Sequence, residues 1–300
     1  MRVLLTGATG FIGSALVRAL VERGDTCTVI SRSGRSVWPD LDVRMVSADP
    51  RVAGPWQDDV GQADAVVNLA GERIMDPPRR WTAERKRRLW VSRVTTTERV
   101  AAAIKAAPRP PGVLVSASAV GYYGDRGDAL VHETTPAGKD FLGRLAHEWE
   151  TAARGAEDVT RVTLLRTGIV LGRGGGALAP LLPLFRAGLG GPWGSGRQWW
   201  SWIHLADQVG VMLLALDTDL SGPVNATAPN PVTVNDLARA LGHALHRPAV
   251  MRAPGWALRL GLGEAAGALL ASQRAVPGRA LAAGYAFRYE NVNDALADVV

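Results

Sequence analysis

The feature that most constrains the fold of this chain is a glycine-rich run, Thr6–Gly13. The apolar run Val3–Leu5 precedes it, and an amphipathic segment from Ser14 to Arg23 follows it. A strand that leads through a glycine turn into a helix is the context in which proteins bind the phosphates of a dinucleotide. The run therefore predicts the first strand–helix unit of an α/β fold.

The three glycines of this run have separate roles in such a turn. Gly7 permits the tight turn, Gly10 lets the backbone approach a pyrophosphate, and Gly13 lets the helix pack close to its strand. Free N–H groups and the positive end of the helix dipole then face the phosphates. A turn that only connects two elements is the alternative, but the flanking segments favour a cofactor site. We expect that site to include Gly7, Thr9, Gly10, Phe11, Ile12 and Gly13.

The composition is that of a globular protein, with 47% hydrophobic and 21% charged residues in a chain of 300. No apolar run reaches the length that spans a bilayer. The first predicted strand begins within the first three residues, which leaves no room for a signal peptide, and Cys27 is the only cysteine. These features predict a cytoplasmic protein without internal disulfides, in which Cys27 is buried and inert.

The net charge of +6 raises the question of a nucleic-acid partner. Only Lys86, Lys105 and Lys139 of the 34 basic residues are lysine, so the charge reflects a preference for arginine. The one dense basic cluster, residues 79–93, lies in a helix-like stretch, where a solvated face is the usual explanation. We find no nucleic-acid-binding motif, and we expect neither nucleic acid nor a membrane as a partner.

Apolar strands alternate with helical patterns through the first half of the chain. The predicted strands cover residues 3–6, 26–31, 43–47, 65–69, 113–116 and 162–166, and the predicted helices cover residues 11–23, 83–106 and 140–154. This alternation predicts a Rossmann-type, doubly wound parallel sheet with helices on both faces. Ligands of such sheets bind at the carboxyl ends of the strands.

The texture of the sequence changes after about residue 170, where glycine-rich loops cover residues 172–176 and 188–196. We therefore divide the chain into a dinucleotide-binding Rossmann domain, residues 1–170, and a smaller, mostly helical substrate domain, residues 171–300. Segments from later in the chain can still contribute to the Rossmann domain.

The end of the second predicted strand indicates which dinucleotide is bound. It carries Ser31 and Arg32, where an NAD-selective enzyme usually has a carboxylate for the ribose 2′-hydroxyl. A hydroxyl and a guanidinium instead suit a 2′-phosphate, although Arg32 can also be one more surface arginine. The pair favours NADP(H) over NAD.

Other strand ends complete the expected cofactor site. Asp49, after the third strand, can accept a hydrogen bond from the adenine amino group. At the end of the fourth strand, Leu69, Ala70 and Gly71 let the backbone lie against the riboses. Arg93, on the following helix, is equally well interpreted as a phosphate or ribose ligand and as a solvated residue.

These features resemble the extended short-chain dehydrogenase/reductase superfamily, in its sugar-nucleotide epimerase branch. The resemblance rests on Thr6–Gly13, Asp49, Asn68–Gly71 and Ser116–Gly124. Later motifs are similar to an atypical epimerase-like family with a C-terminal domain of unknown function; they are Arg166–Gly176, Trp200–His204, Asn225–Pro229 and Ser272–Pro277. The resemblance implies NADP(H) as the cofactor and residues 248–300 as a family-specific module. It supplies no substrate.

In this superfamily a Tyr, with a Lys four residues later, moves the proton, while a Ser at the end of the fifth strand holds the substrate oxygen. The resemblance assigns Ser118 to that Ser, with Ser116 as the fallback and strand-end hydrogen bonding as the alternative role. No lysine of this chain has a tyrosine four residues before it, so the Tyr–Lys pair is absent. Tyr122 and Tyr123, which follow the Ser118 loop, are the candidates to replace it, with burial of their rings as the alternative.

Two departures weaken the case for a nucleoside-diphosphate sugar as substrate. The chain has Ile169 where the sugar-nucleotide enzymes commonly have Asn, and Trp200 where they commonly have the Arg that grips the diphosphate. Trp200 belongs to a cluster with Trp193, Trp199 and Trp202. This cluster is either an apolar pocket floor or, with more support, core packing.

The sequence thus predicts an NADP(H)-dependent oxidoreductase or epimerase-like enzyme that acts on an unidentified small carbonyl or hydroxyl substrate. Because the Tyr–Lys pair is missing, the alternative is a non-catalytic NADP(H)-binding protein whose C-terminal domain contacts a partner. We expect no metal site. A homodimer through two helices is common in the superfamily and is expected here only by analogy.

Overall fold

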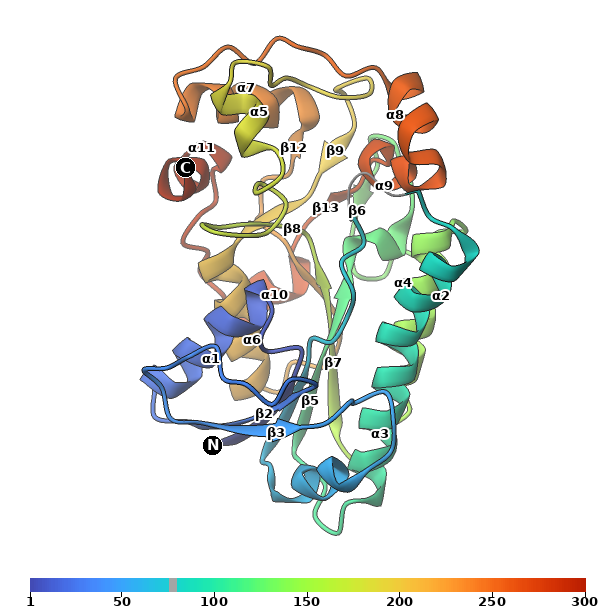
Figure 1. The fold of residues 1–300 in the computed structure, drawn as a ribbon, viewed down its shortest axis with the longest axis vertical. Coiled ribbons are helices and arrows are strands. Elements are labelled where there is room, and N and C mark those ends of the chain that lie inside the picture. The colour runs from blue at the N-terminus through green and yellow to red at the C-terminus, as the bar shows by residue number, and fades with distance from the viewer. Residues whose placement is uncertain (76–79) are drawn as a thin grey trace.

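Seven parallel strands form the central sheet of this protein, for which a computed structural model describes residues 1–75 and 80–300 (Figure 1). In spatial order they are β11 (Gly222–Ala226), β7 (Arg161–Thr167), β5 (Val113–Ala119), β4 (Ala65–Asn68), β1 (Arg2–Thr6), β2 (Thr26–Ser31) and β3 (Val43–Ser47). The predicted doubly wound α/β class is confirmed. The outer strand β11 comes from beyond residue 170, so the sheet draws on both halves of the chain.

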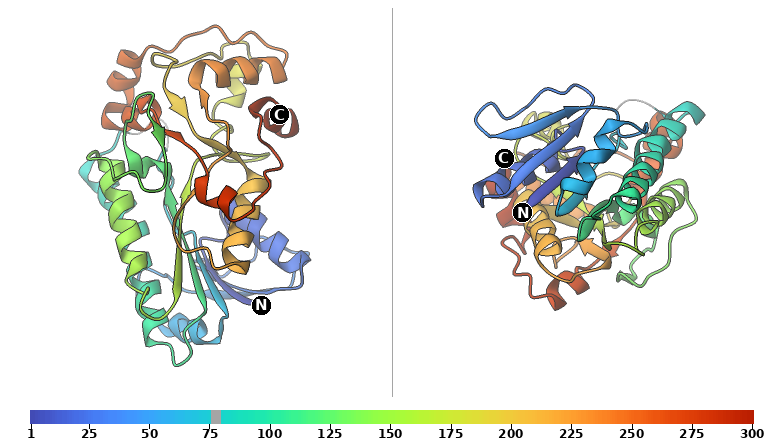
Figure 2. Two further views of the ribbon diagram at one scale, coloured as in Figure 1. Left: turned by 180° about the vertical axis from the view of Figure 1, so that it is seen from behind. Right: turned by 90° about the horizontal axis from the view of Figure 1, so that it is seen from below.

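Helices cover both faces of this sheet (Figure 2). The helices α1 (Phe11–Glu22) and α6 (Leu205–Asp217) pack on one face, where Val3, Leu5 and Val115 point into the core. The helices α3 (Thr96–Ala106) and α4 (Phe141–Arg154) pack on the other face, against Leu4 and Leu114. The alternation of buried residues along β1 therefore places one core on each side.

The structure divides the predicted helix 83–106 into α2 (Ala83–Trp90), a π-helical turn η2 (Val91–Thr95) and α3. The Ser92 hydroxyl and the Arg93 guanidinium both donate to the carbonyl oxygen of Leu89, at 3.1 and 3.3 Å. These side-chain bonds occupy an oxygen that the regular helical ladder uses, and they turn Ser92 and Arg93 inward. Arg79 of the basic cluster lies outside the described residues.

Shorter elements complete the chain. In the first half they are η1 (Pro55–Gln62), η3 (Val120–Tyr123), β6 (Leu130–Val131) and β8 (Ile169–Leu171). In the second half they are α5 (Leu182–Arg186), β9 (Trp199–Trp200), β10 (Trp202–His204), β12 (Val232–Thr233), α7 (Val234–Ala244), α8 (Gly255–Leu262), η4 (Gly263–Ala266), α9 (Gly267–Leu270), β13 (Arg274–Ala275), α10 (Gly278–Ala282) and α11 (Val292–Val299). Within the described ranges, no helix combines the length and the apolarity that crossing a bilayer requires.

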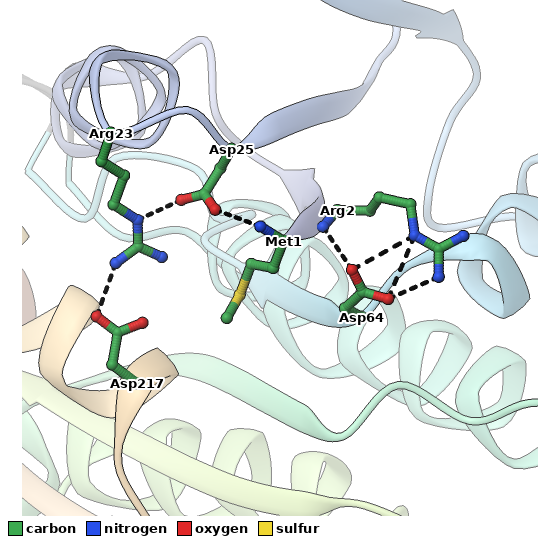
Figure 3. Close-up of polar contacts among 6 residues, drawn as sticks. All are labelled: Met1, Arg2, Arg23, Asp25, Asp64 and Asp217. Atoms are coloured by element: carbon green, nitrogen blue, oxygen red, sulfur yellow. Dashed lines mark hydrogen bonds and ion pairs between the residues drawn. The ribbon is translucent and has the colours of Figure 1, made fainter.

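Ion pairs fix the amino-terminal edge of the sheet (Figure 3). The Asp64 carboxylate accepts bonds from both the backbone N–H and the guanidinium of Arg2, at 2.7 and 2.6 Å. Asp25 accepts from the Met1 ammonium, and Arg23 connects the end of α1 to Asp217 of α6, at 2.7 Å. These bonds lie at the end of the sheet opposite to the one where ligands are expected.

Candidate cofactor site

The turn between β1 and α1 has the geometry that the glycine run predicts. Gly7 has φ of +70°, and a Cβ atom on it would lie 2.5 Å from the backbone carbonyl carbon of Leu69. A Cβ atom on Gly13 would lie 2.5 Å from the Cα atom of Ala8. Only glycine fits at either position, because β4 and α1 approach the turn so closely. The first βα unit is therefore as tight as a phosphate-binding turn requires.

The first turn of α1 offers its N–H groups to a ligand. The N-cap residue, Gly10, has no side chain with which to cap the helix, and no acidic residue lies in the first turn. Thr9 and Gly10 are exposed, while Phe11 and Ile12 are half-buried. The unpaired N–H groups and the helix dipole make this helix end a suitable place for an anion.

The segments that follow β2 and β3 lie side by side. The Ala48 N–H donates to the carbonyl oxygen of Ser31 at 3.0 Å, and a Cβ atom on Gly34 would lie 2.7 Å from that of Ser47. Arg32 is exposed, and the hydroxyl oxygens of Ser31 and Ser33 lie 3.3 Å apart. This sheet edge therefore presents two hydroxyls and a guanidinium.

Asp49 lies at the same edge, but its carboxylate has a partner within the chain. The Arg51 side chain donates to both carboxylate oxygens, at 2.6 to 3.0 Å, and the Arg51 N–H donates to one of them at 3.0 Å. The hydrogen bonds from Arg51 hold the pKa of Asp49 below its ordinary value, and the nearby Arg32 acts in the same direction. No local pattern predicts this pairing of Arg51 with Asp49, although the two residues are only two positions apart.

Arg93 lies beneath the end of β4 and does not extend into solvent. Only 8% of the residue is exposed, and its guanidinium donates to the carbonyl oxygen of Glu72 at 2.7 Å. The guanidinium carbon is 5.2 Å from the centroid of the Trp149 ring, and a Cβ atom on Gly71 would approach it to 3.1 Å. Burial lowers the pKa of Arg93 to about 10, and the neighbouring Arg85 acts in the same direction. Of its two interpretations, the solvated one does not fit this burial.

Ser118 is buried at the end of β5 and belongs to a charged network. Its hydroxyl donates to Oε1 of Glu150 at 2.7 Å, and Arg166 binds both oxygens of the same carboxylate, at 2.7 and 2.8 Å. Ser118, Glu150 and Arg166 are each at most 3% exposed. The fallback residue, Ser116, is also buried, and its hydroxyl has no partner among the described residues.

The two candidate tyrosines have different surroundings. Tyr123 has no exposed surface; its hydroxyl donates to Asn225 at 2.5 Å and accepts from Arg166 at 3.0 Å. Burial raises the pKa of Tyr123 to about 12. Tyr122 is half-buried, and the guanidinium carbon of Arg166 lies 3.5 Å from its ring centroid. Of the three residues predicted to act in catalysis, only Tyr122 has an accessible side chain.

Glu150 and Asn225 are the members of this network whose roles sequence reasoning missed. Glu150 occupies the buried stripe of α4, beside Trp149 and Ala153. An acidic residue on an otherwise apolar stripe signals a buried charge that needs a partner. Asn225 gave no comparable signal, because its bond to Tyr123 spans 102 positions of the chain.

The C-terminal region holds the loop that carries the two tyrosines. The Gln273 amide donates to the carbonyl oxygen of Gly124 at 3.0 Å, and the Ser272 hydroxyl donates to that of Gly127 at 2.6 Å. The Arg126 N–H donates to the carbonyl oxygen of Ser272 at 2.8 Å. The module after residue 248 therefore positions the tyrosine loop directly.

Most of the tryptophan cluster lies in the core of the second half. Trp193, Trp200 and Trp202 are each at most 7% exposed, and the ring centroids of Trp193 and Trp200 are 4.7 Å apart. Trp199 is half-buried beneath the Arg274 guanidinium.

Burial raises the pKa of the Cys27 thiol to about 11. Among the residues that the structure describes, no group of His, Cys, Asp or Glu is arranged to hold a metal ion.

Known proteins are similar in sequence to this chain over its whole length. Residues 3–227 match the model of the NAD dependent epimerase/dehydratase family, and residues 253–299 match a domain of unknown function, DUF1731. The chain is 44% identical to an epimerase family protein, SDR39U1, of Bos taurus, over 100% of both chains. It is 42% identical to a chloroplastic SDR39U1 homologue of Arabidopsis thaliana, over 99% of this chain and 86% of the homologue.

A solved structure is similar over the same extent. The crystal structure of the human epimerase family protein SDR39U1 with NADPH aligns with a TM-score of 0.87 and 38% identity. The alignment covers 100% of this chain and 99% of the human one. The similarity includes the C-terminal region as well as the sheet.

Proposed function

This chain belongs to the NAD dependent epimerase/dehydratase family, and from that premise we propose that it is an NADP(H)-dependent oxidoreductase or epimerase-like enzyme. Its substrate would be a small molecule with a carbonyl or hydroxyl group. The observation that carries the proposal is the Gly7–Gly13 turn, whose uncapped helix end lies beside a strand end that has Ser31 and Arg32 in place of a carboxylate. The NADPH in the human relative's crystal structure supports the same cofactor.

Each part of the proposed cofactor site has a defined role. The backbone from Gly7 to Gly13 would hold the pyrophosphate, and Ser31 with Arg32 would hold the 2′-phosphate. Asp49 would accept from the adenine amino group through a lone pair that Arg51 leaves free. The backbone of Leu69, Ala70 and Gly71 would lie against a ribose. Arg93 would act indirectly, because its guanidinium donates to the carbonyl oxygen of Glu72 and so fixes the segment that follows Gly71.

A bound nicotinamide supplies a hydride acceptor or donor, and the chain's own residues would position the substrate. Tyr122 is the accessible phenol, and we assign to it the hydrogen bond to the substrate oxygen. Ser118 and Tyr123 would act as positioning residues, because their hydroxyls already bind Glu150 and Asn225. The Arg166 guanidinium, which stacks on Tyr122, connects these groups to the accessible ring.

A screen of small aldehydes and ketones with NADPH tests this proposal. We expect the purified protein to oxidise NADPH in the presence of at least one of these compounds. The reaction is followed as the loss of absorbance of the reduced nicotinamide. Tyr122→Phe should then lower kcat more than KM, because the phenol acts on the reacting oxygen. Tyr123→Phe should leave more activity than Tyr122→Phe. Equal activity of wild type and Tyr122→Phe on a confirmed substrate would remove Tyr122 from this role.

The buried state of Ser118 and Tyr123 also supports a second function, an NADP(H)-binding protein without catalysis. Both hydroxyls have partners inside the chain, and no Tyr–Lys pair is present. In that case NADPH would raise the melting temperature while no carbonyl compound is reduced. Steady-state hydride transfer by the pure protein would exclude this alternative.

A further inference from the structure

Six large apolar side chains are exposed at one end of the long axis of the molecule. This end is formed by α5, α7, α8 and the segment between α7 and α8 (Figure 1). The apolar residues, which together we name the apical surface, are Leu184, Leu189, Val250, Met251, Trp256 and Leu260. Val250 is 76% exposed, Trp256 70% and Leu260 68%, values that are unusual for such large side chains.

Hydrogen bonds hold the parts of this surface next to one another. The Met251 N–H donates to the carbonyl oxygen of Gly190 at 3.1 Å, and the Ala253 N–H donates to that of Pro192 at 3.0 Å. The segment before α8 therefore runs beside the segment after α5, which brings Met251 close to Leu189. On α8, Trp256 and Leu260 are four residues apart and project from the same side of the helix.

The unpaired charges on the segments that carry these side chains are positive. Arg186, Arg247, Arg252 and Arg259 are exposed here, and none of them pairs with a carboxylate among the described residues. The sequence has no Asp or Glu from residue 159 to 206, or from 237 to 263. The two carboxylates that flank the second range have partners, because Asp236 pairs with Arg239 and Glu264 with Lys86.

We propose that the apical surface binds the surface of an anionic membrane. Exposed Trp and Leu side chains with neighbouring arginines are the combination by which interfacial segments bind lipid. Anionic headgroups attract the arginines, and the apolar side chains enter the boundary between headgroups and acyl chains. The projecting end of an elongated molecule fits a flat bilayer, whereas the hot spots of protein partners occupy well-packed pockets. This proposal revises the expectation, drawn from composition, that the chain has no membrane partner.

Vesicle sedimentation tests the proposal with the full chain. The probes are vesicles of phosphatidylcholine alone and vesicles that also contain phosphatidylglycerol. We expect the protein to sediment with the second kind at low salt, and to be released as salt screens the arginines. Trp256→Ser with Leu260→Ser should reduce the bound fraction at least about fivefold, because both apolar contacts are lost. Arg252→Gln with Arg259→Gln should reduce it and weaken its dependence on salt.

Val159→Ser is the matched control, since Val159 is 40% exposed but lies outside the apical surface. It should bind vesicles like wild type, and circular dichroism should show that every variant is folded. Absence of binding to the anionic vesicles would overturn the proposal. Equal binding by wild type and the Trp256→Ser, Leu260→Ser variant would also overturn it. If these substitutions instead abolish a concentration-dependent increase in mass without vesicles, the surface joins copies of the chain and the proposal is wrong.

Discussion

The hydroxyl of Tyr123 lies between two side chains from distant parts of the chain, and its removal tests the buried network. Tyr123→Phe leaves the Asn225 oxygen without its donor, in a place that water does not reach. We expect the free energy of unfolding to fall by about 1–3 kcal/mol, the usual cost of an unsatisfied buried group. Urea denaturation measures this change.

Tyr122→Phe is the control, because the Tyr122 hydroxyl forms no hydrogen bond with a described residue, and the cation–π contact of its ring with Arg166 is preserved. Its stability should stay within about 0.5 kcal/mol of wild type, as for most substitutions outside such networks. Equal losses in the two variants would show that the Tyr123 hydroxyl adds nothing specific.

The Asp64 carboxylate makes a pH-dependent contribution at the opposite edge of the sheet. The hydrogen bonds from Arg2 lower the pKa of Asp64 from 3.8 to about 2. A carboxyl with a lowered pKa in the folded state stabilises the protein above its unfolded pKa, and this contribution is lost as the pH falls. Between about pH 4 and pH 2, wild type should therefore lose more stability than Asp64→Asn.

Urea midpoints measured across this pH range check the prediction. Asp42→Asn is the control, since Asp42 is exposed and forms no ion pair within the described chain. It should follow wild type. A constant difference between wild type and Asp64→Asn over the whole range would contradict the assigned cause. The bond pattern of Asp64 (Figure 3) makes it a better test than the other surface pairs.

At the scale of elements, the glycine-rich loop 172–176 is packed against the start of α1. A Cβ atom on Gly175 would lie 2.4 Å from the Phe11 ring, and one on Gly172 would lie 2.8 Å from it. Phe11 is the first residue of α1, so a displaced ring disturbs the helix end proposed to bind phosphate. Gly175→Ala should weaken NADPH binding about tenfold, in line with the 1–3 kcal/mol that overpacking costs.

Two further variants distinguish this contact from a general loss of stability. Gly174→Ala changes the same loop at a position where a Cβ atom meets nothing within 4 Å, and it should retain most of the affinity despite its φ of +75°. Phe11→Leu should rescue Gly175→Ala, because it removes the ring but keeps the backbone N–H. Weak binding that persists in this double variant would show that the loop acts by another route. Affinities come from titration calorimetry.

The strands of the first half were predictable because their signals are local. Val3–Leu5 and the apolar runs that follow it along the chain have the composition of strands buried on both faces, and the structure places strands there. The π-helical turn at 91–95 was not predictable, since it depends on where Ser92 and Arg93 find partners. The short strands β8, β9, β12 and β13 pair only across long separations, which no local pattern records.

The candidate site also combines residues whose positions local sequence patterns predict with residues whose surroundings they do not predict. The positions of Gly7, Gly13, Ser31 and Arg32 follow from the turn and the strand ends, which sequence patterns locate well. The surroundings of Ser118 and Tyr123 depend on partners that are 32 and 102 positions away. Sequence reasoning placed Ser118 at the strand end and Tyr123 in the loop after it, with strand-end hydrogen bonding and ring burial as their alternative roles. It did not identify Glu150 and Asn225 as the partners.

At the scale of the whole molecule, the two halves form one structure around the strand ends. The strand β11 completes the sheet, and Ser272 and Gln273 hold the loop that carries the tyrosines. The fold thus brings the proposed phosphate-binding turn, the strand end that carries Ser31 and Arg32, and Tyr122 to one edge of the sheet. We propose that this edge binds NADP(H) and that Arg32 selects it over NAD(H).

Titration calorimetry with NADPH and NADH, on wild type and on Arg32→Asp, tests this claim most directly. We predict that wild type binds NADPH at least about tenfold more tightly than NADH, because a charge-assisted contact to the 2′-phosphate contributes about 1.5–3 kcal/mol. Arg32→Asp should lose this preference and keep its affinity for NADH. Equal binding of the two nucleotides by wild type, or an undiminished preference in Arg32→Asp, would contradict it.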